Sequence, residues 1–416
     1  MKIFKFGGAS VKDALGVKNL VEVLNKTQEN DLVIVVSAMG KTTNALEQVV
    51  NAYFHNKTAL KAAVKASLKF HENIVFELFE GKNEFLVKKM RAYFIEVIAF
   101  LERNKSPHYN FVYDQVVSYG ELISTTIVSA YLEYYGYKNE FLDIRSCLKT
   151  NTSYREGKVL WDESQHNIVK AISKNGITIT QGFIASDENG FTTTLGREGS
   201  DYSAAIMGYC LSATSVTIWK DVPGVLNADP RYFKDAILLN TISYQEAIEL
   251  SFYGATVIHP KTLQPLQQKE IPLYVKSFEN PLAAGTCVTK GELIEPLTPC
   301  YILKTGQVLL SLSSLDFSFM VEENIGEVFK LLGKYKMKVD VIQNSAISFS
   351  VCIEDRYNNL VELKEHLNRD FKVTIHKNVD LYTIRHFTQA ALEKIEENKN
   401  VLIKQVSENT VQLVTY

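Results

Sequence analysis

Three short segments of the sequence combine glycines with hydroxyl-bearing or charged side chains, each where an apolar run ends and a helical pattern begins. They are residues 5–10 (KFGGAS), 37–44 (SAMGKTTN) and 194–201 (TLGREGSD). In an open α/β sheet, strands end and helices begin at one edge, where unpaired N–H groups bind anions. Glycines let the backbone approach phosphate oxygens, and Lys5 adds a point charge. Three such segments together predict a nucleotide polyphosphate site, whereas a single one is equally well explained as a tight turn.

Two common phosphate motifs are absent from the sequence. Gly40-Lys41-Thr42 resembles the end of a P-loop, but Val35 stands where that loop requires a glycine. No G-x-G-x-x-G fingerprint occurs, which argues against a dinucleotide-dependent dehydrogenase. The phosphate site must therefore be of another design.

The elements that position these segments alternate as in a parallel sheet covered by helices. Strands are predicted at residues 3–6, 32–38, 177–184 and 216–219, because these segments are apolar and contain β-branched residues. Apolar spacing predicts helices at residues 11–24 (with Ser10 as N-cap), 58–103, 115–136, 201–212, 243–253 and 260–270. This pattern indicates an open, mostly parallel sheet with helices on both faces.

The pattern changes after a Gly- and Pro-containing stretch near residues 284–299. Short strands then enclose short helices in a β-α-β-β order, and a partial second copy follows. This order is typical of small ferredoxin-like α+β modules. We therefore predict one α/β domain at residues 1–284 and a pair of small modules at residues 300–416, the second abbreviated.

Composition limits the class of protein. The 416 residues are 46% hydrophobic and 22% charged, as in a globular protein with a large core. Lys and Arg total 45 against 47 for Asp and Glu, so no one-sided basic field favours nucleic acid. The five cysteines are scattered singly, as expected of free thiols in a reducing compartment. Without a signal-peptide or transmembrane pattern, we expect a cytoplasmic protein with no membrane partner.

In this order, the three segments resemble those of the aspartokinases in the amino-acid kinase family. Further similar motifs are residues 117–124 (VSYGELIS), 181–184 (QGFI), 219–225 (WKDVPGV), 228–231 (ADPR), 253–255 (YGA), 257–260 (VIHP) and 285–286 (GT). The C-terminal pattern, including residues 339–342 (VDVI), is similar to the paired ACT modules of that family. The resemblance implies an amino-acid kinase domain followed by a regulatory region of two intertwined ACT-like modules at residues 300–416.

The resemblance also implies an activity, which is transfer of the γ-phosphoryl group of ATP to the side-chain carboxylate of L-aspartate. This reaction opens lysine, threonine and methionine biosynthesis. The implied catalytic residues are Lys5 and Asp201. The implied aspartate-binding residues are Ser37, Thr43, Glu121, Arg197 and Ser200. The implied ATP-binding residues are Lys5, Phe6, Gly7, Gly8, Lys220, Asp221, Leu226, Arg231 and Thr256. Mg²⁺ would be held mainly by ATP oxygens, and no protein metal site is expected.

This chemistry needs no general base. A carboxylate with a pKa of about 3.9 is already ionised at neutral pH and can act as the nucleophile. The protein has to position the reactants in line and neutralise the moving charge. We therefore interpret His259 as a structural histidine.

Some of these residues also have plainer interpretations. Glu121 at a helix start is favourable to the helix itself, and Asp201 could be an N-cap. Arg197 beside Glu198 could form a solvated ion pair of little energetic value. The resemblance and the Gly-flanked loop favour the functional interpretation.

Several positions depart from the family pattern. They include Ala9 after the paired glycines, Glu198 for a glycine, Pro223 for an aspartate and Leu226 for a tyrosine. Thr256 occupies the position of a lysine expected to reach ATP, while Lys220 stands where threonine is usual. We hypothesise that Lys220 supplies the charge that is missing at position 256.

The sequence leaves two alternatives to an aspartokinase. One is a kinase for another acidic amino acid, such as glutamate or acetylglutamate. The other is a catalytically degenerate amino-acid sensor of the same fold. In the leading interpretation the C-terminal modules bind an amino-acid effector and pair between subunits, giving a homodimer or a larger homo-oligomer.

Overall fold

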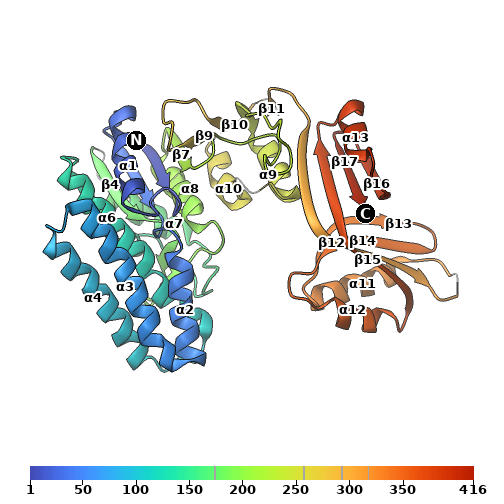
Figure 1. Cartoon of the computed structure of the whole chain (residues 1–416), viewed down its shortest axis with the longest axis horizontal. Helices are drawn as coiled ribbons and strands as arrows, with labels where there is room; N and C mark the ends of the chain where they lie inside the picture. Colours follow the sequence, from blue (N-terminus) through green and yellow to red (C-terminus); the bar gives the residue numbers. More distant parts are fainter. Residues whose placement is uncertain (173–174, 256–257, 292–293, 317) are drawn as a thin grey trace. The chain divides into compact units, whose positions relative to one another are not determined.

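The computed structural model describes residues 1–172, 175–255, 258–291, 294–316 and 318–416. The chain folds into two compact units, coloured mainly blue to green and orange to red in Figure 1. The first unit is built from residues 1–225, 238–248 and the described part of 257–293. The second is built from residues 226–237, the described part of 249–256, and 294–416. Each unit has its own sheet.

A mostly parallel sheet forms the centre of the first unit, and the strands that this unit contributes to it follow the order β8-β10-β9-β7-β1-β2-β4-β3. Its strands are β1 (Lys2–Phe6), β2 (Leu32–Val36), β3 (Asn139–Leu142), β4 (Ile177–Gln181), β7 (Ser215–Lys220), β8 (Thr241–Ser243), β9 (Leu273–Ser277) and β10 (Thr286–Thr289). β10 runs antiparallel to β9, and the other pairings described within this sheet are parallel. A separate hairpin contains β5 (Ile184–Ser186) and β6 (Thr192–Thr194). The predicted α/β fold class is confirmed.

Helices cover both faces of this sheet. They are α1 (Ala14–Thr27), α2 (Thr42–His55), α3 (Lys57–Phe79), α4 (Glu84–Arg103), α5 (Tyr109–Val117), α6 (Tyr119–Tyr134), α7 (Trp161–Ala171), α8 (Gly199–Leu211), α9 (Tyr244–Tyr253) and α10 (Pro260–Gln268), with a 3-10 turn η1 (Ile144–Ser146). On one face, Phe4, Phe6 and Trp219 join buried residues of α1 to α6 in a single core. On the other, α8 packs so closely that a Cβ on Gly208 would lie 2.7 Å from Val216 of β7. Strand β2 is buried along its whole length, as its β-branched sequence predicts.

Three helix predictions are wrong in detail. The helix predicted over residues 58–103 is two helices, because Glu80 and Gly81 adopt positive φ values of 51° and 77°. The helix predicted over 115–136 is likewise divided between α5 and α6. The first helix begins at Ala14 with Asp13 as its N-cap, while the Ser10 hydroxyl donates to the carbonyl of Trp219 at 3.0 Å. Local sequence places these elements but not their ends.

The second unit contains one antiparallel sheet in the order β13-β14-β12-β15-β17-β16. The helices and strands of residues 294–416, of which β11 is not part of this sheet, are β11 (Ile294–Glu295), β12 (Cys300–Ser314), α11 (Glu322–Lys334), β13 (Lys338–Asn344), β14 (Ser348–Glu354), α12 (Leu360–Leu367), β15 (Phe371–Arg385), α13 (Gln389–Glu396), β16 (Val401–Ser407) and β17 (Thr410–Thr415). The long strands β12 and β15 pair along most of their length, so both modules share them. Helices α11 and α12 pack over one half of the sheet and α13 over the other. The expected pair of small α+β, ACT-like modules is confirmed.

Across the described ranges, the chain contains no helix with both the length and the apolar character needed to cross a membrane.

Candidate active site

The carboxyl ends of four neighbouring parallel strands lie side by side at one edge of the first sheet. Phe6 of β1 pairs with Val36 of β2 and with Trp219 of β7. Val36 pairs in turn with Gln181 of β4. Just beyond these pairs, the backbone N–H of Ser37 donates to the Phe6 carbonyl at 3.0 Å. The segments that follow these strands are therefore brought to one place, as expected at the carboxyl edge of an open sheet.

A buried carboxylate at this edge holds two lysines. Asp201 lies in the first turn of α8 and is 1% exposed. Its Oδ1 is 2.5 Å from the Lys5 Nζ, and its Oδ2 is 3.4 Å from the Lys220 Nζ. Burial by itself would raise the pKa of this carboxyl, but the two lysines outweigh burial and hold its pKa below the ordinary value. An ionised Asp201 thus orients two ammonium groups from adjacent strands.

The paired glycines after β1 leave room beside the Lys5 ammonium. A Cβ on Gly7 would lie 3.1 Å from the Lys5 Nζ, and a Cβ on Gly8 would lie 2.8 Å from the Ala38 carbonyl oxygen. The backbone N–H of Gly40 donates to the Gly8 carbonyl at 3.0 Å. Residues without a side chain are therefore required where the two loops touch. The backbone is left accessible next to a cation, which suits phosphate oxygens.

Glu121 is a second buried carboxylate, and it has no cationic partner among the described residues. It lies in the first turn of α6, and its Oε2 has no hydrogen-bond partner among the described residues. Burial raises the pKa of Glu121 to about 8, although the backbone N–H groups of Glu121 and Ala38 act in the opposite direction. The Ser124 hydroxyl donates to the Ser37 carbonyl at 2.7 Å, so α6 begins against the loop that follows β2. A desolvated carboxylate here is suited to a ligand ammonium group.

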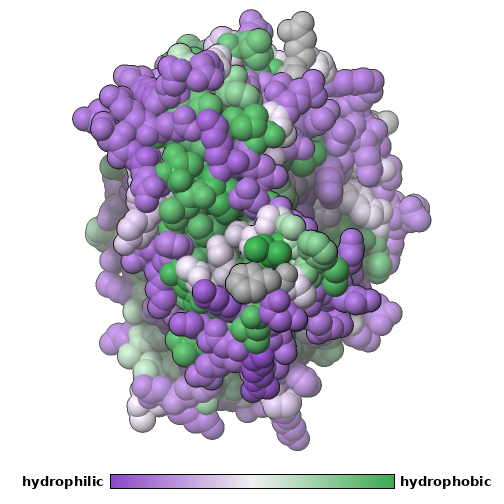
Figure 2. Space-filling view, turned by 90° about the vertical axis from the view of Figure 1, so that its right-hand side faces the viewer, coloured by the Kyte–Doolittle hydropathy of each residue, from purple (hydrophilic) through white to green (hydrophobic). Residues whose placement is uncertain are grey.

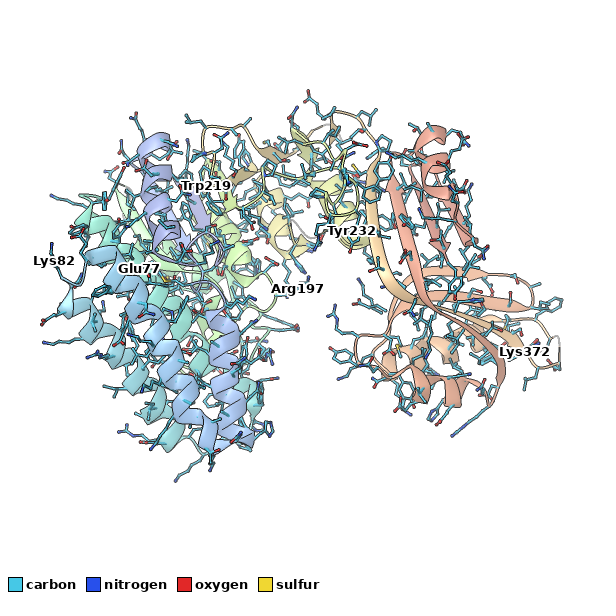
Figure 3. The ribbon with its side chains drawn as sticks, in the orientation of Figure 1. Glu77, Lys82, Arg197, Trp219, Tyr232 and Lys372 are labelled. Carbon is cyan, nitrogen blue, oxygen red and sulfur yellow. The ribbon has the colours of Figure 1, made fainter. Side chains whose placement is uncertain are left out.

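The third predicted segment begins α8 at the same edge. Gly182, after β4, is required because a Cβ there would lie 2.6 Å from the Cβ of Ser200. Arg197 is exposed on the outside of the first unit and forms no ion pair or hydrogen bond among the described residues (Figure 3). The neighbouring Glu198 adopts a positive φ of 53°, which explains why glycine is usual there. Arg197 is thus available to a carboxylate ligand.

The remaining predicted site residues differ in how well they are placed. Phe6 is buried, Ser37 and Thr43 are half-buried at the end of β2 and the start of α2, and Asp221 is exposed directly after β7. Leu226 and Arg231 belong to the second unit, where Arg231 pairs with Asp229 at 2.6 Å. Thr256 lies outside the described residues. A role for Leu226, Arg231 and Thr256 at the nucleotide stays a prediction.

His259 has a local structural contact. Its Nδ1 accepts a hydrogen bond from the backbone N–H of Lys261 at 3.2 Å, so the side chain caps α10. Burial, followed by the charges of Lys261 and Arg197, lowers the pKa of His259. This contact agrees with its interpretation as a structural histidine.

The site offers few ligands for a metal ion. Within the part of the chain that the structure describes, no three His, Cys, Asp or Glu side chains form a group that could hold a metal. Asp201 is already engaged by two lysines. With so few carboxylates free to coordinate a metal ion, these residues suit a Mg²⁺ ion that takes most of its ligands from nucleotide oxygens.

Sequence reasoning missed two buried polar residues near these loops. Asp114 of α5 accepts hydrogen bonds from the segment that precedes Arg197. His71 of α3 has its Nε2 3.3 Å from the Oγ1 of Thr42, the first residue of α2, and burial lowers the pKa of His71 to about 4. The available signal was a polar residue inside an apolar helical stripe, such as Asp114 between Val112 and Val116.

Comparison with known proteins agrees with this fold. The model of the amino acid kinase family matches residues 1–277. The chain is 31% identical over 365 residues to lysine-sensitive aspartokinase 3 of Escherichia coli (strain K12), covering 85% of this chain and 78% of that protein. Structures of E. coli aspartokinase III match all of this chain at 25% identity. The complex with lysine and aspartate (T-state) has a TM-score of 0.84, and the match covers 95% of its chain. The complex with aspartate and ADP (R-state) has a TM-score of 0.79, and the match covers 96% of its chain.

The fold and the family match together define a kinase that belongs to the amino acid kinase family. Within this family the chain belongs with the aspartokinases, which confirms the resemblance noted in the sequence.

Proposed function

We propose that this protein transfers the γ-phosphoryl group of ATP to the side-chain carboxylate of L-aspartate, giving 4-phospho-L-aspartate and ADP. The reaction would be the first step of lysine, threonine and methionine biosynthesis. The observation that carries the proposal is the pairing of two unlike charge sites at one sheet edge. Lys5 and Lys220 on Asp201 offer cations to phosphates. The buried Glu121 carboxyl, which has no cationic partner among the described residues, ionises when it pairs with an ammonium group. The solved complex of E. coli aspartokinase III with aspartate and ADP supports this assignment.

In this proposal the phosphates of ATP lie against the Gly7-Gly8 backbone and the Lys5 ammonium. Lys5 neutralises charge as the phosphoryl group passes between oxygens, and Asp201 keeps Lys5 in place. The ammonium group of aspartate pairs with Glu121, and its α-carboxylate pairs with Arg197. Phe6 and Asp221 would border the nucleotide, and Ser37, Thr43 and Ser200 the amino acid.

The remaining carboxylate of aspartate is then free to attack. Because it is already ionised, the chain needs only to orient it, and no side chain has to remove a proton. Mg²⁺ bound with ATP would supply further neutralisation of phosphate charge. The absence of a histidine base from the proposed roles follows from this chemistry.

An ADP-release assay with Mg-ATP tests the proposal and separates it from the alternatives. The acceptors are L-aspartate, L-glutamate and N-acetyl-L-glutamate, each also titrated calorimetrically. We expect release with aspartate only. Release with glutamate or acetylglutamate alone would identify a kinase for another acid. Aspartate binding without any ADP release would identify a degenerate amino-acid sensor.

Replacing Lys220 tests whether it substitutes for the missing lysine at position 256. Lys220→Thr should raise the KM for ATP about tenfold, because a cation facing phosphate oxygens is lost. The KM for aspartate should stay within about twofold of wild type, since Glu121 and Arg197 are unchanged. Initial rates at varied ATP and aspartate measure both constants.

The double variant provides the control for this prediction. Thr256→Lys in the Lys220→Thr background should partly restore ATP use. An unchanged KM for ATP in Lys220→Thr would exclude the hypothesis that Lys220 supplies the charge missing at position 256.

We also propose residues 1–284 as the catalytic part and residues 300–416 as a regulatory part that binds an amino-acid effector. The lysine in the solved complex of E. coli aspartokinase III supports such a role.

We further propose that the protein forms a homodimer or a larger homo-oligomer. The second unit exposes large apolar side chains, among them Phe319, Ile342 and Ile347. Figure 2 shows a face on which hydrophobic side chains gather among hydrophilic ones. Light scattering of the purified chain would measure the assembly.

A further inference from the structure

We propose that Asp114 is a positioning residue that fixes the loop carrying Arg197 and thereby sets the affinity for the amino-acid substrate. The identity of that substrate rests on the proposed function above, but the positioning role does not. Asp114 is fully buried in α5 and takes no part in the proposed chemistry. Its contacts converge on the segment that leads from β6 into the loop.

Asp114 accepts three hydrogen bonds from two segments of the first unit. Its Oδ2 accepts from the backbone N–H of Thr194 and from that of Arg155, both at 2.9 Å. Its Oδ1 accepts from the Thr194 hydroxyl at 2.8 Å. Thr194 is the last residue of β6, three positions before Arg197. The carboxylate therefore fixes the backbone at the point where the loop begins.

Arg155 extends this support to the middle of the loop. Its guanidinium lies 3.9 Å from the Tyr113 ring centroid, and its Nη2 donates to Glu47 of α2 at 3.2 Å. Its carbonyl oxygen would lie 3.1 Å from a Cβ on Gly196, so the loop backbone rests directly on residue 155. Asp114 thus holds both the start of the loop and the surface on which the loop lies.

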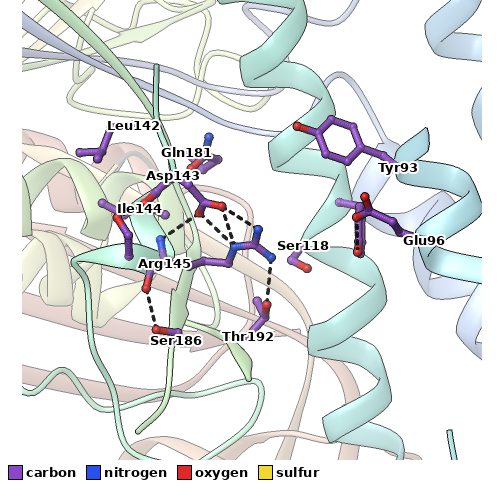
Figure 4. A network of polar contacts seen from close by, with 12 residues as sticks. Tyr93, Glu96, Ser118, Leu142, Asp143, Ile144, Arg145, Gln181, Ser186 and Thr192 are labelled. Carbon is purple, nitrogen blue, oxygen red and sulfur yellow. Dashed lines mark hydrogen bonds and ion pairs between the residues drawn. The ribbon is translucent and has the colours of Figure 1, made fainter. Parts of the chain in front are cut away.

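At the other end of β6 the Gln115 side chain of α5 bonds the Thr192 backbone, while the Thr192 hydroxyl belongs to a different network (Figure 4). There the Arg145 Nη1 donates to the Thr192 hydroxyl at 3.3 Å, and the guanidinium of Arg145 also pairs with Asp143. Thr192 and Thr194 are both buried and lie on the same strand. The two threonines therefore make a matched pair, since only Thr194 contacts Asp114.

The connection to the substrate runs through one continuous stretch of chain. Asp114 in α5 and Glu121 in α6 are seven residues apart, separated by a break at Ser118. The segment that carries Glu121 thus also holds the loop that carries Arg197. If Glu121 and Arg197 bind opposite ends of one amino acid, Asp114 fixes the distance between these two side chains. A loosened loop would then reduce the fraction of protein molecules that can bind the amino acid.

Two isosteric variants test this role. Thr194→Val removes one hydrogen bond to Asp114, and we expect it to raise the KM for aspartate about tenfold, as for loss of a hydrogen bond to a charged group. The KM for ATP should stay within about twofold of wild type, because the Lys5 side of the site is untouched. Thr192→Val removes the contact to Arg145 and should change neither constant. Thr194→Ser keeps the hydroxyl and should restore the wild-type KM.

Hydrogen exchange supplies a second readout that needs no turnover. Amides of residues 195–199 should exchange faster in Thr194→Val and in Asp114→Asn than in wild type or Thr192→Val, while those of β1 stay unchanged. Equal exchange and equal aspartate KM in both valine variants would overturn the proposal. If wild type shows no aspartate turnover, the proposed function fails, and the exchange data still decide whether Asp114 positions the loop. If Thr194→Val does not fold, the amide exchange and the aspartate KM of Asp114→Asn are compared with those of wild type and Thr192→Val instead.

Discussion

Lys5→Met should lower kcat for phosphoryl transfer by about 10³-fold, the size of effect seen when one preorganised donor is removed from a site of developing negative charge. The Lys5 ammonium is buried, lies 2.5 Å from Asp201 and adjoins the space left open by Gly7. Methionine fills a similar volume without a charge, so packing is largely kept. The remaining lysine, Lys220, is 3.4 Å from the same carboxylate and still compensates part of its charge. Rates at saturating ATP and aspartate measure the effect.

A control on the same strand separates chemistry from folding. Lys2→Met removes a lysine of β1 whose partner is Glu29 at the surface, and we expect wild-type kcat. Circular dichroism should show that both variants are folded. A folded Lys5→Met protein with kcat within about tenfold of wild type would contradict the proposed role of Lys5.

Glu121→Gln should raise the KM for aspartate about 100-fold, because a buried ion pair with the substrate ammonium is replaced by a neutral contact. The same change should make the free protein more resistant to heat. Glutamine keeps the shape of the side chain and removes a desolvated carboxyl that no cation contacts in the described part of the chain. Glu121 would thus contribute to binding at a cost to stability. A variant with wild-type KM would contradict the assignment of the ammonium to Glu121.

The gain in stability should depend on pH. The Glu121 pKa is about 8 in the folded protein against an ordinary value of 4.5. Between these values the folded state keeps a proton that the unfolded state has lost, so the free energy of unfolding falls as pH rises through this window. The Tm advantage of Glu121→Gln over wild type should therefore be largest at pH 8 and shrink toward pH 5. A pH-independent difference in Tm would show that burial does not shift this carboxyl.

Aspartate binding should release a proton for the same reason. At pH 7 the free Glu121 carboxyl is mostly protonated, and pairing with an ammonium group favours its ionised form. Calorimetric titrations in buffers of different ionisation enthalpy should detect release at pH 7 and little release above pH 8.

The glycine-rich segments could be predicted from the sequence because their chemistry is local. Glycines, hydroxyls and a lysine directly follow recognisable strands, and in a parallel sheet those positions share an edge. The contact between Lys220 and Asp201 could not be predicted in the same way. It depends on β7 lying beside β1, and strand order is a property of the whole sheet.

Other features required the tertiary structure. The N-cap of the first helix is Asp13 because the Ser10 hydroxyl donates to Trp219, a residue 209 positions away. The hydrogen-bond partners of Asp114 could not be predicted, because β6 and residue 155 are distant from α5 in sequence. The resemblance supplied roles for residues such as Glu121. The structure adds that its carboxyl is buried and that no cation from the described ranges pairs with it.

The central claim is that one sheet edge joins a triphosphate to an ionised side-chain carboxylate. Trapping the product with hydroxylamine tests it most directly. Incubation with Mg-ATP, L-aspartate and hydroxylamine should give aspartyl-β-hydroxamate in amounts equal to the ADP formed, as identified by chromatography and mass spectrometry against the authentic α and β isomers. Formation of ADP without hydroxamate, or of the α-hydroxamate instead, would contradict the claim.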